Sequence, residues 1–321
     1  MRIGQNPAKS LGYVAQPEKF TIAVVSYIPF MEGYYAQSLD LLKVCLSSIW
    51  ENTDLPFDLL VFDNASCPEV RDYLLDARDT GKIQYLVLSD VNIGKAGAWN
   101  FIFGAAPGEF IAYADSDVYF YPGWLAELYR VMEVFPEAGM VTGMPLLNPE
   151  EFSTSTINWI SQHPEARLER GHALTWEDYW RHAGTLGSDR DAARKFYDQH
   201  ESLLMQYKGQ KFILGAGHFQ FLARKQVLQE TLPLPSDRPM GQVRALDIVI
   251  NDLGYLRLCT TEWWVEHLGN SLQGWQPMKG VQQLNIRKES SQPKTKGIMR
   301  WKPVRKVMTK LHSITFDYLY R

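Results

Sequence analysis

The stretch Phe110-Ile-Ala-Tyr-Ala-Asp115-Ser-Asp117 places an apolar run directly before two carboxylates. A short apolar run bounded by polar residues predicts a buried strand. Two carboxylates this close repel each other unless a positive charge lies beside them. A hard divalent cation, Mn²⁺ or Mg²⁺, relieves the repulsion and can bridge phosphate oxygens. We therefore expect Asp115 and Asp117 to bind a metal ion at the end of a strand.

This strand belongs to a longer alternation of apolar runs and helical periodicity. Further β-branched or apolar runs lie at residues 21–26, 59–62, 84–88 and 139–142. Helical spacing of apolar residues, or a polar helical segment, occurs at residues 39–49, 69–78, 95–103 and 125–135. Strand-helix-strand repeats of this kind predict an α/β fold with a doubly wound, mostly parallel sheet.

Polar residues follow three of the predicted strands. Ligands of doubly wound sheets bind beyond the carboxyl ends of the strands, so Asp63, Asn92 and Asp115 should face one crevice. The turn Asn92-Ile-Gly94-Lys95 supplies a glycine for close backbone approach and a cation for phosphate or ribose. The alternative is that these residues only stabilise the local backbone. Asp63 also suits a helix N-cap or an Asx-turn, and residues 92–95 also suit a plain strand-to-helix cap.

Four motifs in register resemble glycosyltransferase family 2, of the GT-A fold. They are Val24-Val25-Ser26, Val61-Phe62-Asp63-Asn64-Ala65-Ser66, Asn92-Ile-Gly94-Lys95 and Asp115-Ser116-Asp117. The resemblance implies an inverting enzyme with a nucleotide-sugar donor. It implies that Asp63 contacts the nucleobase and that Ser26, Asn92, Gly94 and Lys95 lie along the nucleoside. Asp115 and Ser116 would lie at the ribose, with Asp115 also near the metal, and Asp117 would ligate the metal.

The second half of the chain resembles the family more loosely. Gly217 and His218, in Gly215-Ala-Gly-His-Phe219, resemble the acceptor-side loop, although His218 could equally pack as a structural residue. Asp247 occupies the place of the family's catalytic base. The family more often shows two adjacent acids there, whereas Leu246 precedes Asp247 here, and Asp252 is the alternative base.

A late histidine and an insertion complete the expected site. His267, in Glu266-His-Leu-Gly-Asn-Ser271, resembles a histidine that some members use as a further metal ligand, and a satisfied structural histidine is the alternative. Residues 150–210 are polar and mostly helical in tendency, and we interpret them as a helical insertion or lid. Trp180 in that insertion is a candidate platform for an acceptor sugar.

Four segments follow from these patterns. Residues 1–149 form the nucleotide-sugar-binding half, 150–210 the insertion, 211–286 the acceptor-side half and 287–321 a basic tail. The tail holds ten Lys or Arg and two acids in a chain of net charge −3. Its apolar residues Val304, Val307, Leu311, Ile314 and Tyr318 predict an amphipathic helix, which either contacts an anionic membrane peripherally or packs on the core.

Composition narrows the class of protein. The acidic body argues against nucleic-acid binding, and three widely spaced cysteines favour a reducing cytoplasmic setting. No apolar run is long enough for a membrane span, and the first residues lack a secretory signal. We expect a transferase that moves a sugar, with UDP-sugar favoured, to a hydroxyl of a glycan, lipid-linked or small-molecule acceptor.

Two other functions remain open at this point. A sugar-phosphate nucleotidyltransferase would share the sheet and the metal, but the segment after the first strand, Ser26 to Gly33, lacks its glycine-rich loop. A non-catalytic nucleotide-sugar-binding protein on the same fold is the other alternative, since the acid pair at Asp247 is imperfect.

Overall fold

The computed structural model describes residues 3–171, 173–238 and 243–278. The chain divides into two compact units, residues 1–16 with 284–321, and residues 17–283. Of the first unit, residues 3–16 are described, and they contain the 3₁₀ helix η1 (Pro7–Ser10). The predicted amphipathic tail helix and its membrane contact lie outside the described residues. Everything that follows concerns the second unit.

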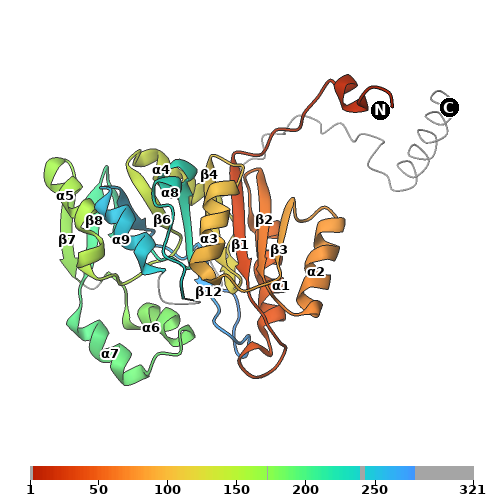
Figure 1. The fold of residues 1–321 in the computed structure, drawn as a ribbon. Coiled ribbons are helices and arrows are strands. Elements are labelled where there is room, and N and C mark those ends of the chain that lie inside the picture. The colour runs from red at the N-terminus through yellow and green to blue at the C-terminus, as the bar shows by residue number, and fades with distance from the viewer. Residues whose placement is uncertain (1–2, 172, 239–242, 279–321) are drawn as a thin grey trace. The chain divides into compact units, whose positions relative to one another are not determined.

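A ten-stranded sheet forms the centre of this unit (Figure 1), in the order β3-β2-β1-β4-β10-β6-β11-β9-β8-β7. Its strands are β1 (Phe20–Ser26), β2 (Phe57–Asn64), β3 (Tyr85–Ser89), β4 (Phe110–Asp115), β6 (Ala138–Thr142), β7 (Arg167–Gly171), β8 (Ser202–Tyr207), β9 (Gln210–Leu214), β10 (Gln220–Arg224) and β11 (Leu256–Cys259). Only β10, β9 and β7 run against the others among the described strands. The predicted α/β fold with a mostly parallel sheet is confirmed.

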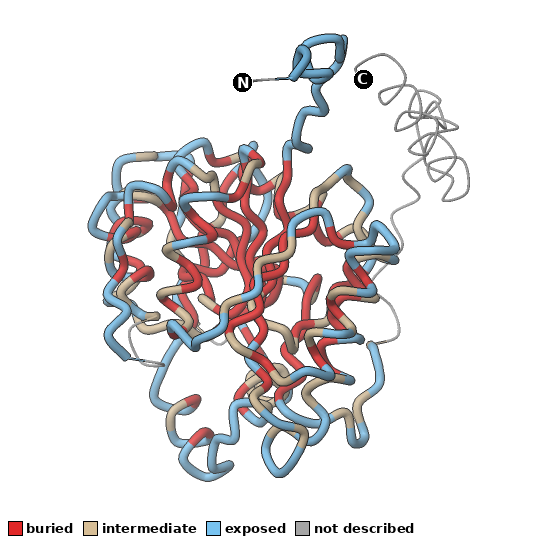
Figure 2. Tube along the Cα trace, turned by 45° about the vertical axis from the view of Figure 1, so that its right-hand side comes forward, coloured by how far each residue is buried: buried red, intermediate tan, exposed pale blue. Residues whose placement is uncertain are grey.

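Helices cover both faces of the sheet because the strand residues alternate. In β1, Ile22 and Val24 belong to one hydrophobic core, and Ala23 belongs to the other. The first core is closed by α1 (Ser38–Asn52), α2 (Pro68–Asp79), α4 (Trp124–Val134) and α5 (Thr154–Gln162). The second is closed by α3 (Gly94–Ala105), α8 (Lys225–Glu230) and α9 (Arg244–Asp252). Figure 2 shows the strands as the buried centre between these layers.

The register of the parallel strands brings their carboxyl ends to one edge. Ser26 lies opposite Asp63, Val25 lies opposite Asp115, and Asn64 lies opposite Ser89. Each strand is followed by a loop or helix that starts at this edge, so side chains far apart in the sequence meet there. The sheet thereby positions the candidate site as the strand-end argument expected.

Residues 150–210 are more than a helical insertion. They contain η3 (Glu150–Phe152), α5, α6 (Trp176–Thr185) and α7 (Arg190–Gln199), but also β7 and β8, which extend the main sheet as an antiparallel pair. The sequence of β7, Arg-Leu-Glu-Arg-Gly, is too polar for this edge strand to be predicted from a run of apolar residues. The helices α6 and α7 lie beyond the carboxyl edge of the sheet (Figure 1), as a lid would.

A second, two-stranded sheet joins the two halves of the chain at the same edge. In it, β5 (Val118–Phe120) pairs antiparallel with β12 (Val265–His267), and His267 lies opposite Val118. The backbone N–H of Leu268 also donates to the carbonyl oxygen of Asp117 at 2.8 Å. His267 is therefore held beside the sequence Asp115-Ser116-Asp117. No helix in the described ranges is long and apolar enough to cross a bilayer.

Candidate active site

Asp117 and His267 form the centre of the site. Their side chains face each other across the β5–β12 ladder, with His267 Nε2 3.3 Å from Asp117 Oδ2. The ladder explains this proximity, because the residue before β5 and the last residue of β12 must lie side by side. The two predicted metal ligands therefore converge, although they are 150 positions apart.

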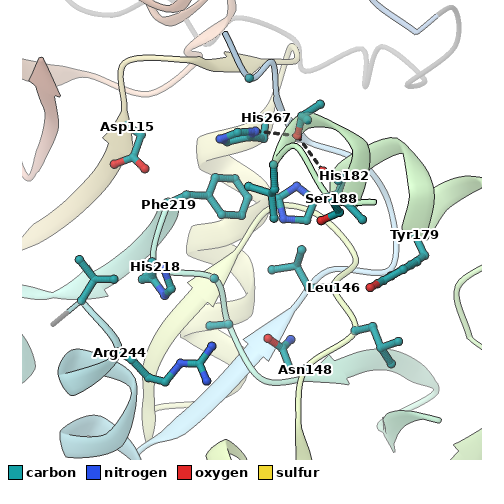
Figure 3. A pocket seen from close by; sticks show the side chains of 18 of the residues that line it. Asp115, Leu146, Asn148, Tyr179, His182, Ser188, His218, Phe219, Arg244 and His267 are labelled. Carbon is teal, nitrogen blue, oxygen red and sulfur yellow. Dashed lines mark hydrogen bonds between the residues drawn. The ribbon is translucent and has the colours of Figure 1, made fainter. Parts of the chain in front are cut away.

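Thr185, the last residue of α6, orients the His267 ring. The Thr185 hydroxyl donates to the carbonyl oxygen of His182 at 2.7 Å, so its oxygen accepts a hydrogen bond from His267 Nδ1 at 2.8 Å. Figure 3 shows both interactions as dashed lines. The other ring nitrogen, Nε2, faces the carboxylate of Asp117. A carboxylate beside an imidazole nitrogen is a common ligand pair for a cation, and a ring held through its second nitrogen is typical of metal-ligating histidines.

Electrostatics around Asp117 support the same interpretation. Burial raises the pKa of Asp117 and the neighbouring carboxylate of Asp115 adds to the rise, while His267 and Lys95 oppose it. A divalent cation would offset the cost of burying this charge. Within the described residues, no three His, Cys, Asp or Glu side chains gather closely enough to hold a metal by themselves. A carboxylate and an imidazole fit Mn²⁺ or Mg²⁺ if phosphate and water complete the coordination.

Asp115 contacts a lysine and a tyrosine instead of a histidine. Lys95 Nζ lies 2.6 Å from its Oδ2, and the Tyr113 hydroxyl donates to its Oδ1 at 2.6 Å. Lys95 sits in the first turn of α3, where the helix N-terminus already favours anions. The cation, the helix end and the Asp117–His267 pair therefore surround one place that suits a diphosphate.

A cavity of about 570 Å³ lies on the β1–β3 side of this place. Among its lining residues are Asn64, Asn92, Lys95 and Ser116. The Asn64 amide donates to Asn92 Oδ1 at 2.9 Å, and Asn92 Oδ1 also accepts from the backbone N–H of Gly94 at 2.8 Å. Gly94 has a positive φ of 75°, a conformation that glycine adopts at no steric cost. The 92–95 turn is thus both a cap and a cavity wall.

Asp63 and Ser26 lie beneath this cavity and are absent from its lining. Both are fully buried, and the Ser26 hydroxyl donates to Asp63 Oδ1 at 3.0 Å. The other oxygen of Asp63 accepts from the backbone N–H of Ser66 at 3.2 Å and from Arg71 Nε at 3.3 Å. Asp63 therefore fixes the loop that carries Asn64. The side chain that lines the cavity is that of Asn64 and not that of Asp63.

A second cavity of about 730 Å³ lies on the other side, between the sheet and α6 and α7. The two cavities share several lining residues, namely Tyr34, Lys95, Asp115, Asp117, Gly269 and Asn270. Gly217, His218, Asp247 and Arg244 line the second cavity (Figure 3 labels His218 and Arg244). Part of each predicted set therefore lines these two adjoining cavities: Asn92, Lys95, Asp115 and Ser116 on the donor side, Asp117 and His267 at the metal position, and Gly217, His218 and Asp247 on the acceptor side.

Trp180 does not line this cavity among the described residues. It stacks on Trp176, with ring centroids 5.8 Å apart, and carries Arg190 over its ring. The aromatic residues that α6 and α7 turn toward the cavity are Tyr179 and Phe196. A helix places adjacent residues on different faces, so the tryptophan and the tyrosine beside it cannot both point inward.

Asp247, in the first turn of α9, is held from two sides. Arg257 Nη2 donates to its Oδ1 at 2.6 Å, and His218 Nδ1 lies 3.1 Å from its Oδ2. Leu246, which stands where the family more often has a second acid, is fully buried in the core. The alternative base Asp252 is exposed and lines a separate cavity beside α5.

Arg257 is the residue that the sequence analysis missed. It lies on β11 with 1% of its surface exposed, and it donates to the carbonyl oxygens of Phe152 and Ala216, each at 2.6 Å. Burial lowers its pKa, and Asp247 opposes that shift. The sequence feature that could have revealed it is an arginine within the apolar strand Leu256–Cys259, because a charge in a buried strand needs a partner.

Comparisons with known proteins show the family and the fold. A family model described as Glycosyl transferase family 2 matches residues 34–196, just over half of the chain. An uncharacterized glycosyltransferase of Nostoc sp. (strain PCC 7120) is 27% identical over 120 residues, which are 37% of this chain. The match spans only 36% of that relative's length.

Solved structures with a related chain path have low sequence identity to this protein, and GalNAc-T7 supports the fold. GalNAc-T7 with UDP, GalNAc and Mn²⁺ is 14% identical at a TM-score of 0.50, over 82% of this chain and 46% of that one. The S. aureus TarS fragment 1–349 is 16% identical at 0.46, over 77% of this chain and 59% of that one. The mannosyltransferase PcManGT from Pyrobaculum calidifontis, with GDP-Man and Mn²⁺, is 16% identical at 0.46, over 78% and 55%.

Proposed function

The chain belongs to glycosyltransferase family 2, and from this premise we propose that it transfers a sugar from a nucleotide-sugar donor to a hydroxyl with inversion. One observation carries the proposal. Two cavities meet at Lys95, Asp115 and Asp117, where a cation, a helix N-terminus and a carboxylate–imidazole pair suit a diphosphate. A donor has this bipartite shape, with a nucleoside on one side of a diphosphate and a sugar on the other.

The β1–β3 cavity takes the nucleoside in this proposal. Asn64 and Asn92 offer amide donors and acceptors to a base or ribose, and Asp63 supports them from beneath. Donor–acceptor groups of this kind suit uracil, so UDP-sugar remains the favoured donor, with dTDP and GDP as alternatives. GalNAc-T7, which shares the fold, was solved with UDP and Mn²⁺.

Asp117 and His267 would hold the divalent metal, and Thr185 would keep the imidazole in the ligating tautomer. Bound there, the ion would act as a Lewis acid that neutralises the departing nucleoside diphosphate. Lys95 adds a positive charge at the same place, and its ion pair with Asp115 keeps the ammonium group in position for the diphosphate.

The acceptor enters the larger cavity, where Gly217, His218 and Asp247 form the wall. Its hydroxyl loses a proton to the Asp247 cluster and attacks the anomeric carbon from the face opposite the phosphate, in a single displacement. The helices α6 and α7 exclude water from this side. Glycan, lipid-linked and small-molecule acceptors all remain predictions.

Calorimetry with UDP-glucose, UDP-N-acetylglucosamine, dTDP-glucose and GDP-mannose, with and without Mn²⁺, tests the donor half. Asp117→Asn should weaken metal-dependent donor binding by roughly 100-fold, since metal contacts are worth several kcal/mol. Asp198→Asn, which breaks an exposed ion pair with Arg194, is the matched control. Donor binding that ignores both chelation and Asp117→Asn contradicts the metal assignment.

Turnover separates an enzyme from a binding protein. The wild-type protein with Mn²⁺ should release UDP, dTDP or GDP from one of these donors, and the product sugar should carry the opposite anomeric configuration by NMR recorded before it mutarotates. Tight donor binding with no release over hours would instead favour the non-catalytic alternative.

A further inference from the structure

Both carboxylate oxygens of Asp247 already have a partner within hydrogen-bond distance. Arg257 occupies Oδ1 and His218 occupies Oδ2, and 6% of the residue's surface is exposed. The group in this cluster that reaches the cavity is the imidazole of His218, whose side chain is 33% exposed.

The His218 ring has a defined tautomer. Because Asp247 Oδ2 can only accept, His218 Nδ1 carries the proton and donates it. This leaves Nε2 with a free lone pair, and no hydrogen bond to it occurs within the described residues. An imidazole whose Nδ1–H is held by a carboxylate and whose Nε2 is free is the arrangement that proton-abstracting histidines use.

The loop that carries His218 is fixed at the two residues that precede it. The backbone N–H of Gly217 donates to Thr142 Oγ1 at 2.8 Å, and Arg257 donates to the carbonyl oxygen of Ala216 at 2.6 Å. The same guanidinium therefore holds both the loop and Asp247. A base must keep its position to within fractions of an ångström, and this double anchor provides that.

We propose that His218 Nε2 is the general base of this enzyme and that Asp247 is a positioning residue that acts through it. The proposal rests on the transferase function above. The acceptor O–H bond breaks and its proton moves to Nε2, while the oxygen lone pair forms the bond to the anomeric carbon. The bond from that carbon to the diphosphate breaks, and its electron pair leaves with the phosphate oxygen. Asp247 stays ionised and stabilises the imidazolium.

Hydrolysis of the best donor of the panel, with water as acceptor, tests this without knowledge of the natural acceptor. His218→Gln should lower kcat by roughly 10²–10⁴-fold and leave donor affinity unchanged. It should also remove the acidic limb of the pH profile of kcat/KM. The charged or titratable groups that face the ring are Asp247 with Arg257 behind it, Arg244 from α9 and His182 from α6.

Rescue distinguishes chemistry from structure. Imidazole added to His218→Ala should restore part of the hydrolysis, whereas it should not help Asp247→Asn, which keeps its imidazole but loses the partner that orients it. His163→Gln, on a histidine stacked against Trp159 outside this cavity, is the control for general effects.

The opposite pattern would overturn the proposal. If His218→Gln keeps most of kcat with its acidic limb intact while Asp247→Asn abolishes turnover, Asp247 is the base itself. Failure of the transferase function looks different, because the wild-type protein would then bind donors and release no nucleoside diphosphate under any condition.

Discussion

Arg257→Met should be among the most damaging single substitutions in the described part of this protein. Methionine matches the length of the arginine stem and keeps β11 apolar, so the change isolates the guanidinium. Its loss leaves Asp247 buried without its ion-pair partner, and the carbonyl oxygens of Phe152 and Ala216 lose their donor. The β9–β10 loop, η3 and α9 would then lose the group that joins them.

The size of the effect follows from these contacts. Removing one partner of a buried ion pair costs about 3–5 kcal/mol. Each carbonyl left without a donor adds roughly 1–3 kcal/mol where water cannot reach it. Stabilities of whole domains are about 5–15 kcal/mol, so we expect a loss of at least ~5 kcal/mol and a fall in Tm of more than ~10 °C.

Urea denaturation followed by circular dichroism measures this loss, and a double-mutant cycle assigns it. Arg257→Met with Asp247→Leu removes both charges and should recover roughly 3 kcal/mol of the single-variant loss. Arg194→Met, which breaks an ion pair that is half exposed on both sides, should cost only about 0–1 kcal/mol. An Arg257→Met protein within 1 kcal/mol of wild type, or a double variant no better than the single one, would refute the reasoning.

Three further predictions follow from other parts of the structure. Thr185→Val should weaken Mn²⁺ binding by about 10–100-fold by freeing the His267 ring, while Thr185→Ser should not, as Mn²⁺ titration of donor binding would show. Of the three cysteines, only half-buried Cys67 should react quickly with Ellman's reagent in the native protein, and fast labelling of all three would contradict the buried positions of Cys45 and Cys259. Burial raises the pKa of Cys259 to about 12 from 9 and also raises that of Cys45, so above pH 9 only the unfolded state releases these protons, and each thiol should lower stability by about 1.4 kcal/mol per pH unit. Cys259→Val should remove its own share of that alkaline slope in thermal scans at pH 8 to 11 and leave the share of Cys45, and an unchanged slope would count against it.

Local patterns predict which strand ends meet, but not that Asp63 is buried beneath the cavity that Asn64 lines. The strand ends at Asp63, Asn92 and Asp115 each follow from one apolar run and its flanking residues, and a parallel sheet then brings them together. The charged sequence of β7 gave no such run, because one face of an edge strand is solvated and its polar residues resemble a loop or helix.

The proposed metal position and the acceptor side depend on contacts that no local pattern contains. The Asp117–His267 pair exists because β5 and β12, three residues each, form a small separate sheet. The hydrogen bond between Thr185 and His267 depends on where α6 ends. The hydrogen bonds that join Arg257, Asp247 and His218 connect a strand, a helix and a loop. Motif resemblance marked Asp247, but only the packing shows that both of its oxygens are occupied.

The helix α6 is fastened to two successive residues of β12. Arg181 Nη2 lies 2.5 Å from Glu266 Oε1, and Thr185 holds His267. The proposed metal position and the proposed acceptor cavity therefore both depend on the placement of α6. If a bound acceptor stabilises α6 and thereby tightens binding of the ion, thermodynamic reciprocity requires that the ion tightens binding of the acceptor by the same factor.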